Sequence, residues 1–449
     1  MPLVRAFRGL GYSLDRYGVT RIPERVRMAD EPDGHPGRIA DLTDLACPPY
    51  DVISDEQREE LLARDPHNAV RLELSAERDP HVSAAGTLAE WRRDGTLERR
   101  ADASVYYYNH ATTADPDEPS VQGVLARVLL EPWGRGMRPH EHTLPAPKQD
   151  RLALLRATET QLSPILVVYF DRSERYRHVM SRAWTDEWRA RDADGLLHQV
   201  AAVEADQRLL TYLSRQTLFV ADGHHRYETA LAYQAEVRSR PEHAAAEPGS
   251  LAADWIMCVL INAELEELQV FGTHRLLHNV GRDALNALAQ DPGPLFGATP
   301  MPPDALPGAL EAAAHQDAPV FGLVMDGAGY LLTGEREPIG ERMRRERLST
   351  AVQRLDLAVL HAAILEDRLG IDADAVGRGD SLTYTRSSAA AIEAVARGAA
   401  DAAILVRPTP IDQMAAVANA GDVMPQKSTY FYPKLLTGMV FNPLSEAED

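Results

Sequence analysis

The sequence is poor in cysteine, with only Cys47 and Cys258 among 449 residues. Two cysteines are too few for the disulfide framework that stabilises small secreted domains. The sequence also lacks an unbroken apolar run long enough to cross a bilayer. Its start, MPLVRAFRGLGYSLDRYG, lacks the apolar segment of a signal peptide. We therefore expect a cytoplasmic protein with no membrane-spanning segment.

An excess of positive charge is absent as well, because the formal net charge is −20. Non-specific binding to DNA or RNA needs clustered positive charge, so we expect no nucleic-acid partner. An anionic ligand would need cations concentrated at its site, because the overall field repels it. The composition, 45% hydrophobic and 25% charged, is that of an ordinary globular protein, and the length favours two or three domains.

Strand-like and helix-like patterns alternate along the chain. Apolar runs predict strands over 104–112, 121–133, 163–171, 252–264 and 268–278. Helical patterns cover 55–66, 84–97 and 147–162. This alternation predicts an α/β or α+β architecture. We place domain boundaries after residues 120 and 285, which gives regions 1–120, 121–285 and 286–449. Prolines and glycines over 289–310 predict a linker or long loop.

The stretch LFVADGHHRYETALAY, residues 218–233, predicts a strand, a tight turn and a helix. Gly223 can take a positive φ at no steric cost, which permits a sharp turn. The first amides of the following helix favour an anion, and Arg226 can bind phosphate oxygens in bidentate fashion. His224 and His225 can donate further hydrogen bonds. The pattern therefore predicts a phosphate site, in preference to an N-capping Asp222 with ordinary turn histidines.

Three further segments are rich in polar groups. MRPHEHTLPAPKQDR, residues 137–151, is a solvated loop or a stiffened polar loop in which Glu141 serves as a general base. In CPPYDVIS two prolines present Tyr50 and Asp51 rigidly. In MPQKSTYFYPKLLTG, residues 424–438, lysines and hydroxyls could hold a carboxylate or phosphate. Each of these last two, taken alone, is better read as a loop with a buried aromatic.

Six segments occur in a fixed order along the chain: PPYDVI, PHEHTLPAPKQDRLALLRAT, SPILVVYFD, VADGHHRYETA, GTHRL and MPQKSTYFYPKLLTGMVF. In them the chain resembles the prokaryotic family known as domain of unknown function 1015, from about residue 46 to the C-terminus. The chain more distantly resembles the free serine kinases of the ParB/sulfiredoxin superfamily. This resemblance lies in the order of four pieces: Pro139-His140-Glu141, a helix over 149–161, Pro164 to Val167, and Asp222 to Arg226.

The resemblance to the kinases implies a ParB/sulfiredoxin-like core with additional N- and C-terminal α/β regions. It implies that Gly223, His224, His225 and Arg226 bind nucleotide phosphates and that Glu141 is the base for a serine hydroxyl. Asp222 would position the substrate or Mg²⁺. The gap from Val167 to Asp222 is longer than this core needs, so we expect an insertion there.

We therefore predict a small-molecule kinase that uses ATP or ADP with Mg²⁺ and phosphorylates an amino acid, foremost free L-serine to O-phosphoserine. Glu141, Asp222 and His225 are the predicted catalytic residues. The predicted substrate-binding residues are Tyr50, Asp51, Arg71, His140, Lys148, Lys427, Ser428 and Thr429. Alternatives are a nucleotide hydrolase or phosphatase, a non-catalytic nucleotide sensor, and a histidine-dependent metalloenzyme. The oligomeric state, including a homodimer, stays open.

Overall fold

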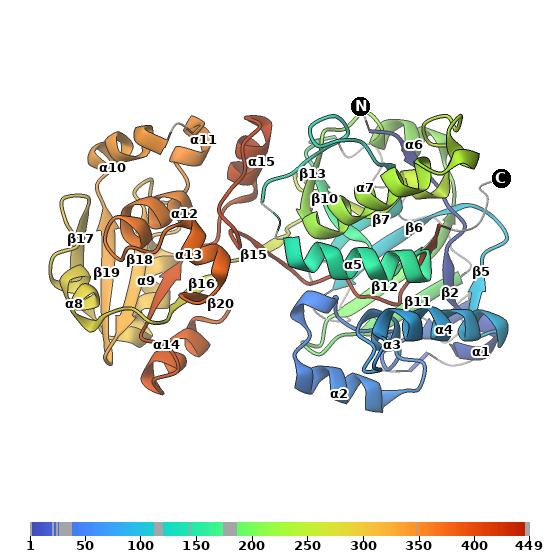
Figure 1. The fold of residues 1–449 in the computed structure, drawn as a ribbon, viewed down its shortest axis with the longest axis horizontal. Coiled ribbons are helices and arrows are strands. Elements are labelled where there is room, and N and C mark those ends of the chain that lie inside the picture. Colours follow the sequence, from blue (N-terminus) through green and yellow to red (C-terminus); the bar gives the residue numbers. More distant parts are fainter. Residues whose placement is uncertain are drawn as a thin grey trace. The chain divides into compact units, whose positions relative to one another are not determined.

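The computed structural model describes residues 2–19, 22–23, 26, 38–111, 120–141, 143, 145–173, 186–346 and 348–444. The chain forms two compact units. The first comprises residues 1–138, 144–268 and 433–449, and the second comprises 139–143 and 269–432. Each unit is a mixture of helices and strands, which confirms the predicted mixed α/β content (Figure 1). The ParB/sulfiredoxin-like core stays a prediction.

An 11-stranded sheet organises the first unit, in the order β3-β4-β11-β12-β6-β7-β14-β10-β13-β8, with β1 paired to β7. Neighbours are mostly antiparallel, but three pairs are parallel: β4 with β11, β10 with β14, and β8 with β13. The strands are β1 (Val4–Arg5), β3 (Gly18–Val19), β4 (Arg38–Asp41), β6 (Ser104–Ala111), β7 (Ser120–Leu129), β8 (Met137–Arg138), β10 (Ile165–Tyr169), β11 (Asp186–Arg191), β12 (Leu197–Glu204), β13 (Leu218–Asp222) and β14 (Trp255–Asn262).

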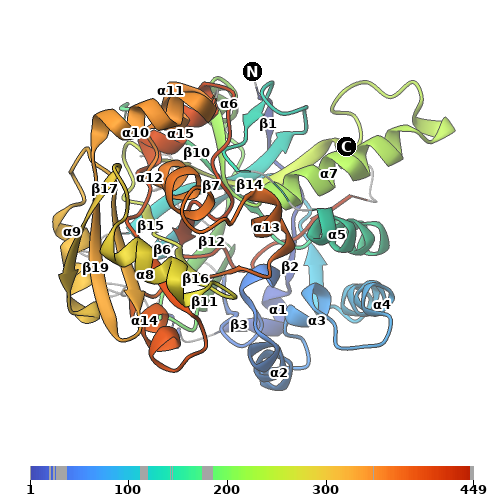
Figure 2. The same cartoon turned by 60° about the vertical axis from the view of Figure 1, so that its left-hand side comes forward.

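Helices α4 (Pro80–Arg93), α5 (Pro145–Thr158) and α7 (His224–Arg238) lie side by side over one face of this sheet (Figures 1 and 2). Tyr227 and Ala230 of α7 pack with Ile165, Cys258 and other buried strand residues in one apolar core. Every residue of β6 and β14 is buried, as expected for strands covered on both faces. This core holds the start of α7 firmly against the strand ends.

Shorter elements complete the first unit. They are helices α1 (Leu14–Tyr17), α2 (Asp55–Arg64), α3 (Val70–Glu73) and α6 (Gln207–Leu213), the 3₁₀ turns η2 (Tyr50–Val52), η4 (Pro241–His243) and η5 (Ala252–Asp254), and the pairs β2 (Leu10–Tyr12) with β5 (Leu97–Arg99) and β9 (Thr160–Gln161) with β23 (Asn442–Pro443). Cys47 and Cys258 are both buried and free. Among the described residues, no helix has both the length and the apolarity that a membrane crossing requires.

The second unit contains an antiparallel six-stranded sheet in the order β17-β19-β18-β21-β16-β20. Its strands are β16 (His274–Leu277), β17 (Phe296–Met301), β18 (Val320–Met325), β19 (Ala328–Gly334), β20 (Leu382–Thr385) and β21 (Ala402–Val406), and β15 (Gln269–Phe271) pairs with β22 (Tyr430–Tyr432). Its helices are α8 (Arg282–Gln290), α9 (Leu306–Ala312), α10 (Arg336–Met343), α11 (Thr350–Gln353), α12 (Asp356–Val359), α13 (Ala373–Arg378), α14 (Ser388–Ala396) and α15 (Ile411–Asn419), with 3₁₀ turns η6 (Pro303–Ala305) and η7 (Arg344–Glu346) and a π-helix, η8 (Leu360–Glu366).

Two sequence predictions about organisation differ from the structure. The predicted linker over 289–310 contains β17 and the start of α9, because β17 pairs with β19 in spite of its proline. The predicted boundaries at 120 and 285 do not coincide with the limits of the two units. The reason at residue 120 is that residues 106–111 of β6 pair with residues 120–125 of β7, which joins both sides of the boundary in one sheet.

Candidate functional site

A sharp turn links β13 to α7, as the sequence predicts. Gly223 has φ 99° and ψ 28°, in the left-handed region that favours glycine. A Cβ at this position would lie 2.5 Å from Cγ2 of Ile165 on β10. The turn therefore needs glycine both for its backbone angle and for space. Helix α7 starts directly afterwards at His224, so its first amides lie beside the end of β13.

Asp222, the last residue of β13, is bonded to two cations. Arg226 Nη2 donates to Oδ2 at 2.7 Å, and Lys434 Nζ donates to Oδ1. Burial opposes ionisation of this carboxyl, but the charges of Lys434 and Arg226 outweigh it and hold the pKa of Asp222 well below its usual range. Asp222 is therefore ionised and fixes two positive groups at the turn.

Arg226 also ties the turn to the start of β10. Its Nη1 donates to the carbonyl oxygen of Pro164 at 2.6 Å and to the hydroxyl of Ser163 at 3.1 Å. These bonds leave N–H groups of the guanidinium for a ligand. Arg226 is therefore held in one position and still has donors for an anion.

The predicted PPYDVI segment lies within electrostatic reach of the same turn. Tyr50 and Asp51 begin the turn η2, and the guanidinium of Arg151 stacks 4.3 Å from the centroid of the Tyr50 ring. Burial raises the pKa of Tyr50 to about 12; the charge of Asp51 acts in the same direction, and Arg226 opposes it. The charges of Asp51 and Arg226 therefore both act on Tyr50, and the role of Tyr50 and Asp51 in substrate binding stays a prediction.

Glu73 and Arg151 form a buried ion pair next to Tyr50. Arg151 Nη1 lies 3.5 Å from Glu73 Oε1 and donates to the Glu73 carbonyl oxygen at 3.1 Å. Burial raises the pKa of the Glu73 carboxyl, while the charges of Arg151 and Arg226 oppose this rise. Two arginines therefore lie close to one buried carboxylate on the side of the turn that faces α5.

The two histidines of the motif differ in exposure. His224 is buried, and its ring centroid lies 6.1 Å from that of Trp133. His225 is half-buried. Both residues interact with other groups of the protein. His225 is therefore better placed than His224 to meet a ligand with its ring, while His224 mainly packs against the protein.

Two predicted substrate-binding cations have partners inside the protein. Lys148 on α5 donates to Glu228 of α7 at 2.7 Å, which joins the two helices. Arg71 on α3 donates to the carbonyl oxygen of Leu62 on α2 at 2.8 Å. Both side chains thus bond to other parts of the protein. These bonds add no support to the predicted contact of Lys148 and Arg71 with substrate.

The remaining predicted residues gather in the second unit. His140 is buried, and its Nε2 lies 3.0 Å from the hydroxyl oxygen of Thr429. The backbone of Glu141 forms an isolated parallel β-bridge with Met424. The negative charge of Glu141 also acts on Arg275. Burial lowers the pKa of Arg275 to about 10, although the charge of Glu141 opposes this change.

The 427–428 segment of this cluster is held through its backbone. Lys427 has φ 55°, and its carbonyl oxygen accepts a bond of 3.3 Å from Arg275. The hydroxyl of Ser428 donates to the carbonyl oxygen of Pro425. The structure therefore joins His140 and Glu141 to the segment 424–429 within this unit, and their role in the reaction stays a prediction.

A metal site does not follow from the described residues. Among them, no group of three or more His, Cys, Asp and Glu side chains could hold a metal ion. Both oxygens of Asp222 bond to cations, so this carboxylate does not fit the predicted Mg²⁺ ligand. Mg²⁺ commonly keeps waters and binds through substrate phosphates, which stays compatible with a nucleotide that carries its own ion.

Sequence reasoning missed residues that complete the site. Lys434 belongs to MPQKSTYFYPKLLTG, whose lysines could hold a carboxylate or phosphate, but it is not among the predicted site residues. Glu73 and Ser163 carry no motif of their own. Only their contacts with Arg151 and Arg226 show their position.

We predict that acid weakens the fold through Asp222. Its pKa is lower in the folded than in the unfolded chain, so its stabilisation is present above the unfolded value, about 3.9, and is lost as pH falls through the folded value. At neutral pH, Asp222→Asn should lose on the order of 3 kcal/mol, because Arg226 and Lys434 lose their counter-charge. Below about pH 4 the difference from wild type should shrink.

Thermal unfolding measured from pH 7 down to pH 2.5 checks this, with Asp102→Asn in an exposed loop as the matched control. If Asp222→Asn and Asp102→Asn unfold at the same temperature at neutral pH, the ion pairs of Asp222 do not stabilise the fold.

Comparisons with known proteins give one family and several distant structures. A family model described as "Protein of unknown function (DUF1015)" matches residues 34–358. No curated protein matches the chain. A free serine kinase in complex with AMP is 12% identical, with a TM-score of 0.35 over 66% of this chain and 83% of that chain. A conserved hypothetical protein from Pyrococcus furiosus is 12% identical, with a TM-score of 0.34 over 67% and 88%. SbnI with a C-terminal truncation, from Staphylococcus aureus, is 13% identical, with a TM-score of 0.35 over 72% and 90%.

Proposed function

Because the chain belongs to the DUF1015 family, whose description names no reaction, we propose its function from the turn between β13 and α7. The protein is a small-molecule kinase. It binds the terminal phosphates of ATP or ADP at residues 223–226 and transfers one phosphate to the hydroxyl of an amino acid, foremost free L-serine.

The convergence of two cations on the start of α7 carries this proposal. Lys434 and Arg226 come from distant parts of the sequence, and Asp222 holds both. The first amides of α7 add partial positive charge at the same place. A chain with a net charge of −20 attracts phosphate only where such groups gather. Phosphoryl transfer depends mainly on positioning and on electrostatic stabilisation, which fixed cations supply.

The proposed reaction is a direct transfer. The acceptor hydroxyl oxygen forms a bond to the terminal phosphorus, and the bond from that phosphorus to the bridging oxygen breaks. The nucleotide leaves with one phosphate fewer. The hydroxyl proton passes to a carboxylate, and the resemblance to the free serine kinases assigns this role to Glu141. Arg226 and Lys434 stabilise the charge on the transferred group and on the leaving oxygen.

Incubation of the purified chain with L-serine, MgCl₂ and either ATP or ADP tests the proposal. Mass spectrometry should detect O-phosphoserine that depends on both serine and the nucleotide. Free phosphate without phosphoserine would indicate a hydrolase or phosphatase instead. Tight nucleotide binding without turnover, on any hydroxyl amino acid tried, would indicate a nucleotide sensor. Both of these results would overturn the kinase assignment.

A further inference from the structure

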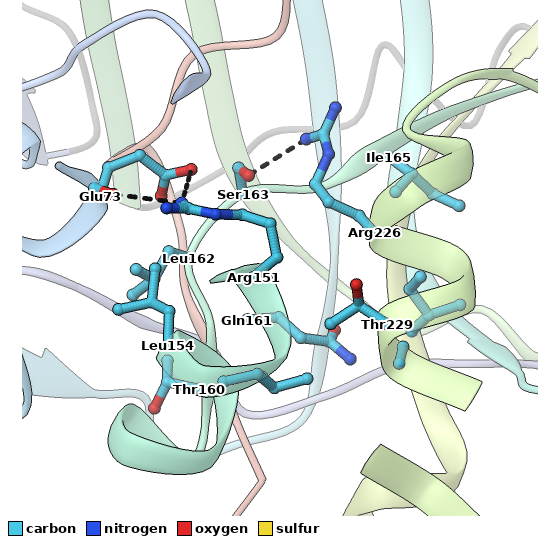
Figure 3. A pocket seen from close by; sticks show the side chains of 13 residues that line it. Glu73, Arg151, Leu154, Thr160, Gln161, Leu162, Ser163, Ile165, Arg226 and Thr229 are labelled. Carbon is cyan, nitrogen blue, oxygen red and sulfur yellow. Dashed lines mark hydrogen bonds and ion pairs between the residues drawn. The ribbon is translucent and has the colours of Figure 1, made fainter. Parts of the chain in front are cut away.

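A small cavity lies beside the turn, between α5, α7 and the strands β10 and β14 (Figure 3). Its volume is about 60 Å³, measured as the space open to the centre of a water-sized molecule. Leucine and isoleucine side chains form much of its wall, and Glu73, Arg151, Ser163, Arg226 and Thr229 are polar groups along it. Arg226 therefore lines this cavity and also belongs to the proposed phosphate turn.

Thr229 has a buried hydroxyl that lacks a partner. The residue is 4% exposed, and within the described part of the chain Oγ1 makes no hydrogen bond. A helical threonine often bonds the carbonyl one turn earlier, which does not happen here. The other neutral polar side chains differ, because Gln161 bonds the backbone of Trp255 and Met257 and Ser163 accepts from Arg226.

The position of this hydroxyl indicates a ligand. Thr229 projects from α7 towards Arg151 and Gln161 across the cavity (Figure 3). An unsatisfied buried hydroxyl is costly, so a partner from outside the chain would remove a real penalty. The hydroxyl also lies close to one helical turn after Arg226, on the same side of α7. A molecule bound to it would therefore lie near the phosphate turn.

The cations around the cavity are paired with carboxylates. Each cation has a carboxylate partner: Arg151 with Glu73 and Asp150, and Arg226 and Lys434 with Asp222. A ligand with a net charge would bring an uncompensated charge into this small, largely apolar space. A zwitterion brings none, and its two charged groups can face an arginine and Glu73 separately.

We infer that this cavity binds the acceptor of the proposed kinase, a zwitterionic amino acid with a short side chain, and that Thr229 helps to select it. The inference rests on the proposed function. The carboxylate of the amino acid faces Arg226, its ammonium faces Glu73, and Thr229 Oγ1 hydrogen-bonds one of these groups. The acceptor hydroxyl then lies towards residues 223–226, where the phosphate is bound.

Calorimetric titration of the full chain tests the pocket, with and without ADP. The probes are L-serine, L-glycerate, which replaces the ammonium by a hydroxyl, and ethanolamine, which lacks the carboxylate. L-serine should bind at least tenfold more tightly than either analogue. Thr229→Val should weaken serine binding by about tenfold, which is typical of one lost hydrogen bond. Thr211→Val, an exposed position on α6, is the matched control and should bind as wild type does.

Thermal unfolding separates a ligand role from a structural one. Without ligand, Thr229→Val should unfold at the wild-type temperature or above, because it removes an unsatisfied hydroxyl. The rise in unfolding temperature caused by L-serine should shrink in this variant. A lower unfolding temperature without ligand would show that the hydroxyl already has a partner, and it would overturn the inference.

The remaining outcomes are also decisive. Equal serine affinity in Thr229→Val and wild type, equal affinity for the three probes, or no serine binding by wild type with or without ADP each overturns the inference. Serine binding that depends on Thr229 without any phosphoserine formation would support the pocket and contradict the kinase. Phosphoserine formation with unchanged kinetics in Thr229→Val would support the kinase and contradict the pocket.

Discussion

Replacement of Glu141 by alanine is expected to lower turnover by about 10²- to 10⁴-fold, the range that a general base contributes to proton transfer. The affinity for ATP or ADP should stay close to wild type, because the proposed phosphate contacts lie at residues 223–226. Steady-state kinetics with L-serine, combined with a nucleotide titration, measures both quantities. Glu141→Gln should behave in the same way, since an amide keeps the shape of the side chain but cannot accept the proton.

A loss of folding must be separated from a loss of the base. The charge of Glu141 acts on the buried Arg275, so its removal can lower stability as well. Thermal unfolding of each variant, at the pH of the assay, shows how much folded protein contributes to the rate. Glu311→Ala, at an exposed position of α9, is the matched control within the same unit. Near-normal turnover of folded Glu141→Ala would rule out the assigned base.

Gly223→Ala should damage both the fold and nucleotide binding. The left-handed backbone and the new Cβ, placed 2.5 Å from Ile165, together should lower the free energy of unfolding by about 1–3 kcal/mol or more. Relief of the clash moves the start of α7 and with it Arg226. We therefore expect at least a tenfold weaker affinity for ATP and ADP, measured by calorimetry beside thermal unfolding.

Gly195→Ala provides a control that separates backbone strain from the steric contact. Gly195 also has a positive φ, of 87°, but a Cβ there meets nothing within 4 Å. This variant should lose about 1 kcal/mol of stability from backbone strain alone and keep its nucleotide affinity. If Gly223→Ala unfolds like Gly195→Ala and binds nucleotide like wild type, the turn is neither tightly packed nor the phosphate site.

Local features of the fold were predictable because they depend on neighbouring residues. The run Leu218–Asp222 followed by Gly223 predicts a strand and a turn from propensity alone, and both are present. The alternation of apolar runs likewise predicts β6, β7, β10 and β14 close to their observed limits. The segment 268–278 shows the limit of such patterns, because a single predicted strand is divided between β15 and β16, which join different sheets.

Amino-acid order alone was enough to identify the strand–glycine–helix turn and its concentration of polar groups, because backbone conformation there follows from adjacent side chains. Folding in three dimensions established the partners of those groups. Lys434 meets Asp222, Glu73 meets Arg151, and the hydroxyl of Thr229 is buried without a partner. Such contacts join residues far apart in the chain. They depend on which strands pair and which helices cover them, and hydrophobic periodicity does not specify either of these arrangements.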